Sequence, residues 1–244
     1  MTVHAAVEAM KLIAEGSRIL YEQEVLDAFG HLSCRNPVRS DSFFISRNLA
    51  PAMVTAEDVI ELDLDCAIVS GAPDSRLFLE RFIHAEIYLR RPDVQAIVHS
   101  HATAVLPFTL VKTARLRPVC HVCGFLEGVP PPFDVADHAG PSTDLLIRNA
   151  ALGRQLADHL GNANVVLMRA HGYTAVGCSV QQAVYRAVYT IKNCQIDLSS
   201  RLLGEPTFLT AGEAAACEVT TGEQVRRAWE LWVQQASSDS SLTY

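Results

Sequence analysis

The sequence lacks a long hydrophobic run: no stretch approaches the roughly 18 apolar residues that a helix needs to span a bilayer. The first residues, MTVHAAVEAMKLIAEG, place Glu8 and Glu15 among apolar neighbours. This pattern is typical of an amphipathic helix and not of a secretory signal peptide. We therefore expect no membrane span, no membrane partner and a location in the cytoplasm.

Cysteine is too scattered for a disulfide framework, because the seven residues form an odd set and no export signal accompanies them. Cys120 and Cys123 have the C-x-x-C spacing around His121, but the sequence has no second such pair. A zinc knuckle or a redox motif is therefore disfavoured. We expect His121 to line a pocket instead.

Basic charge is also scarce. The chain has 20 Lys and Arg against 27 Asp and Glu, a formal net charge of -7, and it has no basic block. This balance argues against nucleic acid or an anionic membrane as the main partner. The glycines form neither a G-x-G-x-x-G nor a P-loop pattern, so no nucleotide cofactor is indicated.

The chain does contain enough apolar material for one large core. Of its 244 residues, 49% are hydrophobic and 19% are charged, which excludes a disordered or coiled-coil chain. No repeat or Ser/Gly linker marks a boundary, and helical and strand-like periodicities alternate. We predict an α/β protein with one domain over residues 1–236 and a frayed tail over residues 237–244.

The predicted elements follow from apolar spacing and capping signals. Residues 127–144 contain a proline triplet that can continue neither a helix nor a central strand, so we predict a long surface loop there. Predicted helices cover 3–15, 18–29, 74–89, 142–161, 179–203 and a last segment capped by Thr220 with Glu223; predicted strands cover 31–36, 42–47, 65–70, 94–105, 117–123 and 165–176.

Three histidines have the spacing of a metal site. His99 and His101 are two residues apart on a predicted strand, so their imidazoles would lie on the same face. His171 follows 70 residues later in another strand-like run, and Gly172 beside it would allow close backbone approach. Three imidazoles with an open position suit a catalytic divalent metal. By spacing alone, an ordinary core or surface histidine pair is about equally compatible.

A polar stripe on the preceding predicted helix leads toward these histidines. Glu80, His84 and Tyr88 are spaced at i, i+4 and i+8 on an otherwise apolar helix. Glu80 could reach the site as a ligand or a proton carrier. The alternative is a local pair of Glu80 with His84, which the spacing alone slightly favours.

The segment ERFIHAEIYLRRPDVQAIVHSHATAV, followed by RAHGYTAVG, resembles the class II aldolase/adducin family over roughly residues 5–205. The resemblance implies a three-layer α/β/α sandwich with a mostly antiparallel central sheet, assembled as a homotetramer with active sites at subunit interfaces. It further implies that the metal ligands are His99, His101 and His171, and that Glu80 is the catalytic acid/base.

The chain departs from the sugar-phosphate aldolases of this family where they bind phosphate. Phe78 and Leu79 replace the hydroxyl pair before the catalytic Glu, and His31 replaces an early Asn. Ser46 and Arg47 stand where a Thr-Gly pair is expected. A phosphate cannot lose its water against Phe and Leu without a large penalty. These substitutions resemble the branch that decarboxylates hydroxylated aromatic or pyridine dicarboxylates, such as 3,4-dihydroxyphthalate.

The expected activity is therefore a metal-dependent, non-oxidative decarboxylation of such a small-molecule dicarboxylate. The metal, one of Zn, Mn, Fe or Co, would act as Lewis acid on a ring hydroxyl and its neighbouring carboxylate. Glu80, His31 or His121 would protonate the ring carbon. Arg47 would bind the remaining carboxylate bidentately, although it or Arg35 could equally be a surface charge.

Other functions remain open at this point. An aldolase acting on a non-phosphorylated hydroxy acid or sugar would keep the same metal residues. An adducin-like interaction module would be expected to lose them. An iron-dependent oxygenase is a more distant alternative.

Overall fold

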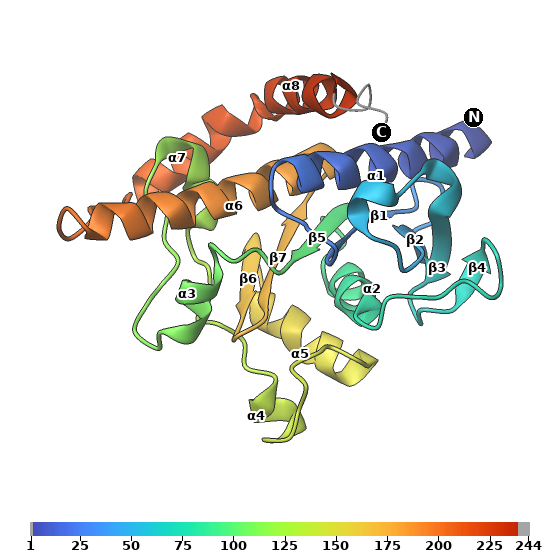
Figure 1. Ribbon diagram of the computed structural model, residues 1–244, viewed down its shortest axis with the longest axis horizontal. Coiled ribbons are helices and arrows are strands. Elements are labelled where there is room, and N and C mark those ends of the chain that lie inside the picture. The colour runs from blue at the N-terminus through green and yellow to red at the C-terminus, as the bar shows by residue number, and fades with distance from the viewer. Residues whose placement is uncertain (1, 239–244) are drawn as a thin grey trace.

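A single antiparallel sheet organises the part of the chain described by the computed structural model, residues 2–238 (Figure 1). The strand order is β4-β3-β2-β1-β5-β7-β6, and every neighbouring pair is antiparallel. The strands are β1 (His31–Arg35), β2 (Ser42–Ser46), β3 (Val59–Asp63), β4 (Ile68–Ser70), β5 (Ala96–Ser100), β6 (Val165–Met168) and β7 (Gly172–Gly177).

Helices cover both faces of this sheet. In Figure 1, α1 and α6 lie along one side of the strands, whereas α2 and α5 lie on the other. The helices are α1 (Thr2–Glu22), α2 (Arg81–Arg90), α3 (Leu106–Leu110), α4 (Ala136–Ala139), α5 (Ala150–Leu160), α6 (Val180–Arg201), α7 (Ala211–Gly222) and α8 (Val225–Ser238), with short 3-10 turns at η1 (Pro51–Met53), η2 (Ala56–Asp58) and η3 (His121–Leu126).

The core is split by the sheet into two hydrophobic clusters. Side chains alternate across a strand, so Phe43 and Ile45 of β2 pack in the cluster under α2 and α5, while Phe44 packs in the cluster under α1 and α6. Both faces are buried, and the central strands therefore enclose polar side chains such as Ser33 and Thr174 among the apolar ones. This arrangement confirms the α/β class and the three layers expected from the family resemblance.

The N-terminal helices were predicted wrongly as two segments divided at Gly16. Instead α1 is continuous, and Gly16 faces β1, where a Cβ would lie 2.6 Å from the Leu32 side chain. The glycine therefore permits close helix–sheet packing and does not end the helix. The helix ends at Glu22, two residues before Glu24, which has a positive φ of 56°.

Several predicted strands need correction. The run 165–176 is a hairpin of two strands, because Ala170 adopts a φ of 53° in the turn between them. The segment 117–123 is not a strand and leads into η3. Strand β3 was missed, and the prediction over 65–70 shortens to β4, since Asp63 accepts the N–H groups of the turn between these two strands.

Three predicted helix starts were wrong, because other residues precede the first turns of these helices. Asn149 caps α5 in place of Ser142, and its side chain accepts the N–H of Leu152. The capping box near the C-terminus is Thr210 with Glu213, which opens α7, a helix that contains Thr220. The start of α2 moves from about 74 to Arg81. Ser179 caps α6 as predicted.

The C-terminal helix extends slightly beyond the predicted domain end. Helix α8 includes Ser237 and Ser238, and the rest of the predicted tail, 239–244, lies outside the described residues. Among the helices described here, none is long and apolar enough to cross a bilayer.

Candidate metal centre

The centre of the sheet positions the first two imidazoles. His99 is the penultimate residue of β5, and the antiparallel register places it between His31 of β1 and Thr174 of β7. His101 lies just past the strand end, where the Ser100 hydroxyl accepts the N–H of Ala102 and turns the chain. The two histidines meet as predicted, but at the end of a strand and not along its face.

His171 reaches the same point from the hairpin between β6 and β7. Gly172 follows it and pairs so closely with β5 that a Cβ there would lie 2.1 Å from the carbonyl oxygen of Ser100. No residue with a side chain fits this approach without moving backbone. The close contact predicted for Gly172 is thus confirmed, and it brings His171 to within hydrogen-bonding distance of His101.

Glu80 is the N-cap residue of α2 and not part of its helical face. Its Oε1 accepts the backbone N–H of Ile147 at 2.9 Å, which holds the carboxylate in place. Its Oε2 lies 3.3 Å from Nε2 of both His99 and His171. The carboxylate therefore faces the imidazoles, and the alternative local pair with His84 is not the one formed.

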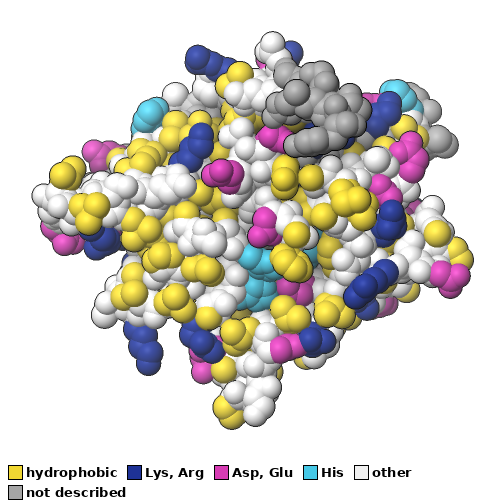
Figure 2. All heavy atoms as spheres, viewed as in Figure 1, with side chains coloured by type: hydrophobic (Ala, Val, Ile, Leu, Met, Phe, Trp, Pro, Cys, Tyr) yellow, Lys and Arg dark blue, Asp and Glu magenta, His cyan; other side chains and the backbone are white. Residues whose placement is uncertain are grey.

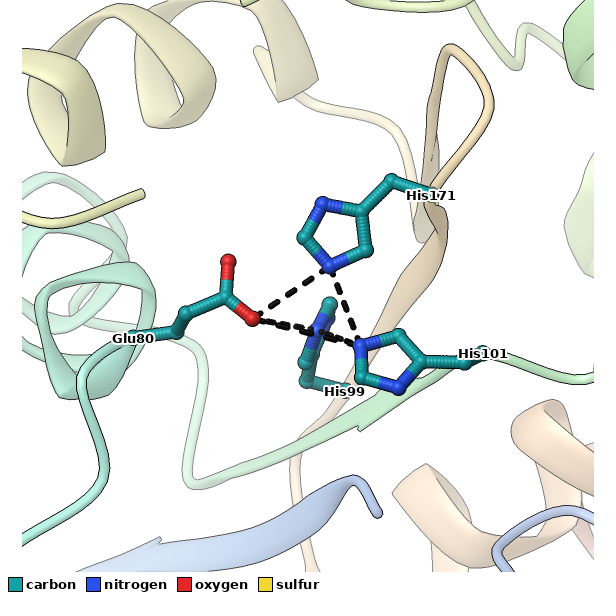
Figure 3. Close-up of side chains that lie close together, drawn as sticks. All are labelled: Glu80, His99, His101 and His171. Atoms are coloured by element: carbon teal, nitrogen blue, oxygen red, sulfur yellow. Dashed lines mark hydrogen bonds and ion pairs between the residues drawn. The ribbon is translucent and has the colours of Figure 1, made fainter. Parts of the chain in front are cut away.

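The four side chains converge on one small volume, as Figure 3 shows. One ligand atom from each lies within 4.8 Å of the others. The Nε2 atom of His101 is 3.0 Å from Nε2 of both His99 and His171. Such a set of three imidazole nitrogens and one carboxylate oxygen is the donor set of a divalent transition-metal site.

The outer nitrogens of two rings are held by the protein. Nδ1 of His171 donates to the carbonyl oxygen of Leu145 at 2.9 Å, which leaves its Nε2 lone pair facing inward. Nδ1 of His99 lies 3.2 Å from the Thr174 hydroxyl. Partners of this kind fix the tautomer of ligating histidines, so the residues present fit a bound metal ion.

The charge states also fit a cation. Burial and the neighbouring histidines lower the pKa of His101 to about 3, and burial likewise lowers the pKa of His99, so both rings are neutral at neutral pH. Burial alone would raise the pKa of Glu80, but the charge and hydrogen bonds of His99 and His171 hold it well below its ordinary value. Burial opposes protonation of His171, yet its bond to Glu80 leaves the pKa raised.

His31 lies beside the cluster at the start of a buried polar chain. Its ring centroid is 5.1 Å from that of His99, and its Nδ1 is 2.6 Å from Nε2 of His84. The chain continues from His84 Nδ1 to the Ser33 hydroxyl at 2.6 Å and on to the Tyr88 hydroxyl at 2.8 Å. Burial is the main cause that lowers the pKa of both His31 and His84. The structure thus brings His31 to the site.

Two further predicted residues directly precede Glu80, and one of them, Phe78, packs on His31. The Phe78 ring centroid lies 4.5 Å from that of His31, and Leu79, which is 51% exposed, directly precedes Glu80. Both are thus placed on the chain leading into the cluster.

Ser46 and Arg47 lie at the end of β2, two strands away from β5. Ser46 is buried, and Arg47 donates from Nε to Asp58 at 2.8 Å with about half of its side chain exposed. The register that pairs Ser33 with Ile45 brings position 47 to the same sheet end as His31.

The structure does not bring His121 to the cluster. It begins η3 and lines a hollow together with Tyr185, Tyr189 and Trp232. Arg35 is also occupied elsewhere, because its guanidinium donates to the carbonyl oxygens of residues 40, 88, 91 and 94.

Sequence reasoning missed three contributors to the site. Thr174 could have been found as a polar residue between the buried Tyr173 and Ala175. The backbone partners at Leu145 and Ile147 leave no signal in a sequence, because any residue supplies the same groups. Figure 2 shows histidine side chains gathered near the middle of one face, among acidic and hydrophobic side chains.

Comparison with known proteins agrees with this geometry. Residues 11–198 match the Class II Aldolase and Adducin N-terminal domain. The chain is 40% identical to Decarboxylase tropJ of Talaromyces stipitatus over 265 aligned positions, which cover 100% of this chain and 99% of that one. It is 29% identical to the 3,4-dihydroxyphthalate decarboxylase of Terrabacter sp., over 73% of this chain and 75% of the relative.

Solved structures share the fold. The L-fuculose 1-phosphate aldolase from Glaciozyma antarctica PI12 superposes with a TM-score of 0.77 at 22% identity, covering 98% of this chain and 92% of that one. Likeness at this level of identity supports the architecture alone.

Proposed function

The chain belongs to the class II aldolase and adducin family and is a lyase, and on this premise we propose that it is a metal-dependent, non-oxidative decarboxylase. The substrate we propose is a hydroxylated aromatic or pyridine dicarboxylate such as 3,4-dihydroxyphthalate. The relatives named as decarboxylases support the reaction class, and the side chains around the cluster support the substrate class.

The observation that carries the substrate class is the aromatic border of the cluster. Phe78 packs on His31, and His31 packs on His99, so flat rings adjoin the metal ligands directly. An aromatic ring gains contact area and favourable ring packing there, whereas a phosphate would lose water without a compensating charge at Phe78 and Leu79.

Each residue of the cluster would have a separate role in the proposed reaction. His99, His101 and His171 would hold the metal, which when bound supplies Lewis-acid stabilisation of the ring hydroxyl and its adjacent carboxylate. Glu80, held as a carboxylate by its neighbours, would accept a proton at Oε2 and return it to the ring carbon after carbon dioxide leaves. His31, oriented by its bond to His84, is the second candidate for that transfer.

Binding of the carboxylate that stays on the ring would fall to Arg47, with Ser46 beside it. Asp58 uses only Nε of that guanidinium, and a planar guanidinium can hold a carboxylate through two parallel hydrogen bonds. We expect Arg47→Ala to raise KM, and Arg47→Lys to restore only part of the lost affinity.

The proposal extends to assembly and location. We propose a homotetramer in the cytoplasm, and the exposed apolar side chains of the described surface support association into an oligomer. Leu202, Leu203 and Val219 are 87%, 94% and 71% exposed in the isolated chain.

A pair of matched ligands tests the substrate class. We expect a ring dicarboxylate with a hydroxyl ortho to one carboxylate to release carbon dioxide, and its analogue without that hydroxyl to bind competitively without reacting. Equal turnover of both would contradict the proposal. The rival function, an aldolase for a non-phosphorylated hydroxy acid or sugar, retains the same cluster and would instead yield pyruvate or an aldehyde.

A further inference from the structure

The sequence alone disfavours a redox motif at Cys120 and Cys123, but the distance between their sulfurs favours one, and we propose that they form a redox-active dithiol. This dithiol closes to an intramolecular disulfide by exchange with a small disulfide such as oxidised glutathione. Both are free thiols, and their Sγ atoms lie 3.2 Å apart. Cys120 is the N-cap residue of η3 and Cys123 lies in its first turn, so the C-x-x-C spacing brings both side chains to one side. Only a small movement is needed to bond the two sulfurs.

The two thiols have different environments, as an attacking and a resolving cysteine require. Cys120 is half-buried, whereas Cys123 is fully buried beside the carbonyl oxygen of Tyr189. The hydrogen bond with Cys123 lowers the pKa of Cys120, and the same bond together with burial raises the pKa of Cys123. Cys120 is therefore the nucleophile, because a small disulfide can reach only the more exposed thiol and the thiolate is the reactive form.

A hollow next to the pair can receive the small disulfide. It has a volume of about 430 Å³, and the two residues between the cysteines, His121 and Val122, line it. Lys192 and Arg227 add positive charge to the same hollow, and Lys192 Nζ lies 5.2 Å from the Tyr189 ring centroid. Cationic side chains suit the carboxylates of glutathione.

The pair is separate from the metal centre. Cys123 belongs to the core cluster under α1 and α6, whereas Glu80 precedes α2 on the opposite face of the sheet. The reaction of the two cysteines can therefore be measured independently of any enzymatic activity.

The exchange balances in two steps. The Cys120 thiolate attacks one sulfur of oxidised glutathione, forming a mixed disulfide and releasing one glutathione thiolate. Cys123 then loses its proton and attacks the Cys120 sulfur, which releases the second glutathione. The protein loses two electrons and two protons, and these convert the glutathione disulfide into two thiols.

Intact mass and peptide mapping of the reduced protein, incubated with oxidised glutathione and a chelator at pH 7, test the proposal. We expect wild type to lose two hydrogens, located in the peptide that contains both cysteines. Cys123→Ser should accumulate one glutathione on Cys120, roughly ten-fold faster than the exposed Cys178 reacts. Cys120→Ser should carry none on Cys123.

Controls separate this site from general thiol reactivity. Cys178→Ser should leave the reaction of the pair unchanged, and Lys192→Ala should slow the reaction with oxidised glutathione several-fold but not that with an uncharged disulfide. The proposal is overturned if the wild-type pair remains as two thiols while Cys178 is modified. It is also overturned if a folded Cys123→Ser protein gains no glutathione on Cys120.

Discussion

For two of the three histidines, the partner of the outer ring nitrogen leaves the other nitrogen facing the centre of the cluster. The Leu145 carbonyl accepts from Nδ1 of His171, so that ring can offer only Nε2 to the centre. The two carboxylate oxygens of Glu80 also have different partners: Oε1 accepts the N–H of Ile147, and Oε2 faces the imidazoles. The cluster is therefore preorganised by backbone groups, which keeps the reorganisation needed for metal binding small.

Replacing any one ligating histidine should remove the metal. We expect His99→Ala, His101→Ala and His171→Ala each to lower metal affinity at least ten-fold, because each deletes one of the three imidazoles proposed to hold the metal. Metal content of the purified proteins, measured by mass spectrometry, checks this. His121→Ala is the matched control and should retain its metal, since His121 lines a different hollow. Full occupancy in all three ligand variants would contradict the assignment.

The buried His84 predicts how the stability of the metal-free protein depends on pH. Burial and the charge of His99 lower its pKa from 6.5 to about 3. As the pH falls below 6.5, His84 becomes protonated in the unfolded chain, but in the folded protein it stays neutral down to about pH 3. The free energy of unfolding therefore decreases between these two pH values. Between pH 7 and pH 5 this one residue should account for about 2 kcal/mol.

Urea unfolding at both pH values, for the wild type and His84→Gln, measures that contribution. Glutamine keeps a hydrogen-bonding group but cannot be protonated, so the variant should lose less stability between pH 7 and pH 5. An identical pH dependence in both proteins would contradict the prediction, because it would mean that the pKa of His84 is about the same in the folded and the unfolded chain.

At the scale of elements, the hairpin between β6 and β7 sets the position of His171. In Gly172→Ala the new Cβ would meet the Ser100 carbonyl oxygen and the Cα of His101, at 2.1 and 3.0 Å. Both contacts are backbone, so the hairpin must shift. We expect a loss of about 2–3 kcal/mol in stability and at least a ten-fold loss in metal affinity, measured by urea unfolding and metal titration.

Ala170→Gly is the matched control in the same turn. Ala170 has a φ of 53°, which glycine adopts without strain. Its stability should stay within about 1 kcal/mol of wild type, with metal affinity retained. Equal behaviour of the two variants would mean that the close approach at Gly172 does not position His171.

Elements with a strong local signal were predictable from the sequence. The strands 31–36 and 42–47 are found almost as predicted, and Ser179 caps the long helix α6. The failures have two causes: a tertiary contact overrides local preference at Gly16, and the turn and the caps that end or begin other elements lie at residues not expected to do so. From the sequence, Gly16 is expected to break a helix, but in the structure it allows β1 to pack against the helix. The apolar run 165–176 is expected to form one strand, but a turn divides it into two.

The site was predictable only in part, because its members come from distant segments. The H-x-H pair and the later histidine predicted three side chains that do meet in the cluster, and the family resemblance is the basis for the role expected of Glu80. Spacing alone favoured a pair of Glu80 with His84, since both were expected on one helix face. Because α2 begins only at Arg81, Glu80 precedes the helix and faces β5. His84 lies within the helix and hydrogen-bonds with Ser33 and His31 instead.

At the scale of the whole molecule, one sheet serves two separate chemistries on its two faces. The face under α2 and α5 carries the Glu80 and histidine cluster with its aromatic border, and the face under α1 and α6 carries the dithiol. The reaction catalysed at the first face is the central claim.

The most direct test of that claim is to measure carbon dioxide release by the metal-loaded protein. The substrates are a panel of hydroxylated aromatic and pyridine dicarboxylates, with fuculose and ribulose phosphates assayed alongside them. We predict carbon dioxide from at least one dicarboxylate and no aldehyde from either sugar phosphate. Glu80→Gln should lower that turnover by about 10²- to 10⁴-fold while remaining folded. Rapid sugar-phosphate cleavage, with no carbon dioxide from any dicarboxylate, would contradict the proposed function and favour an aldolase.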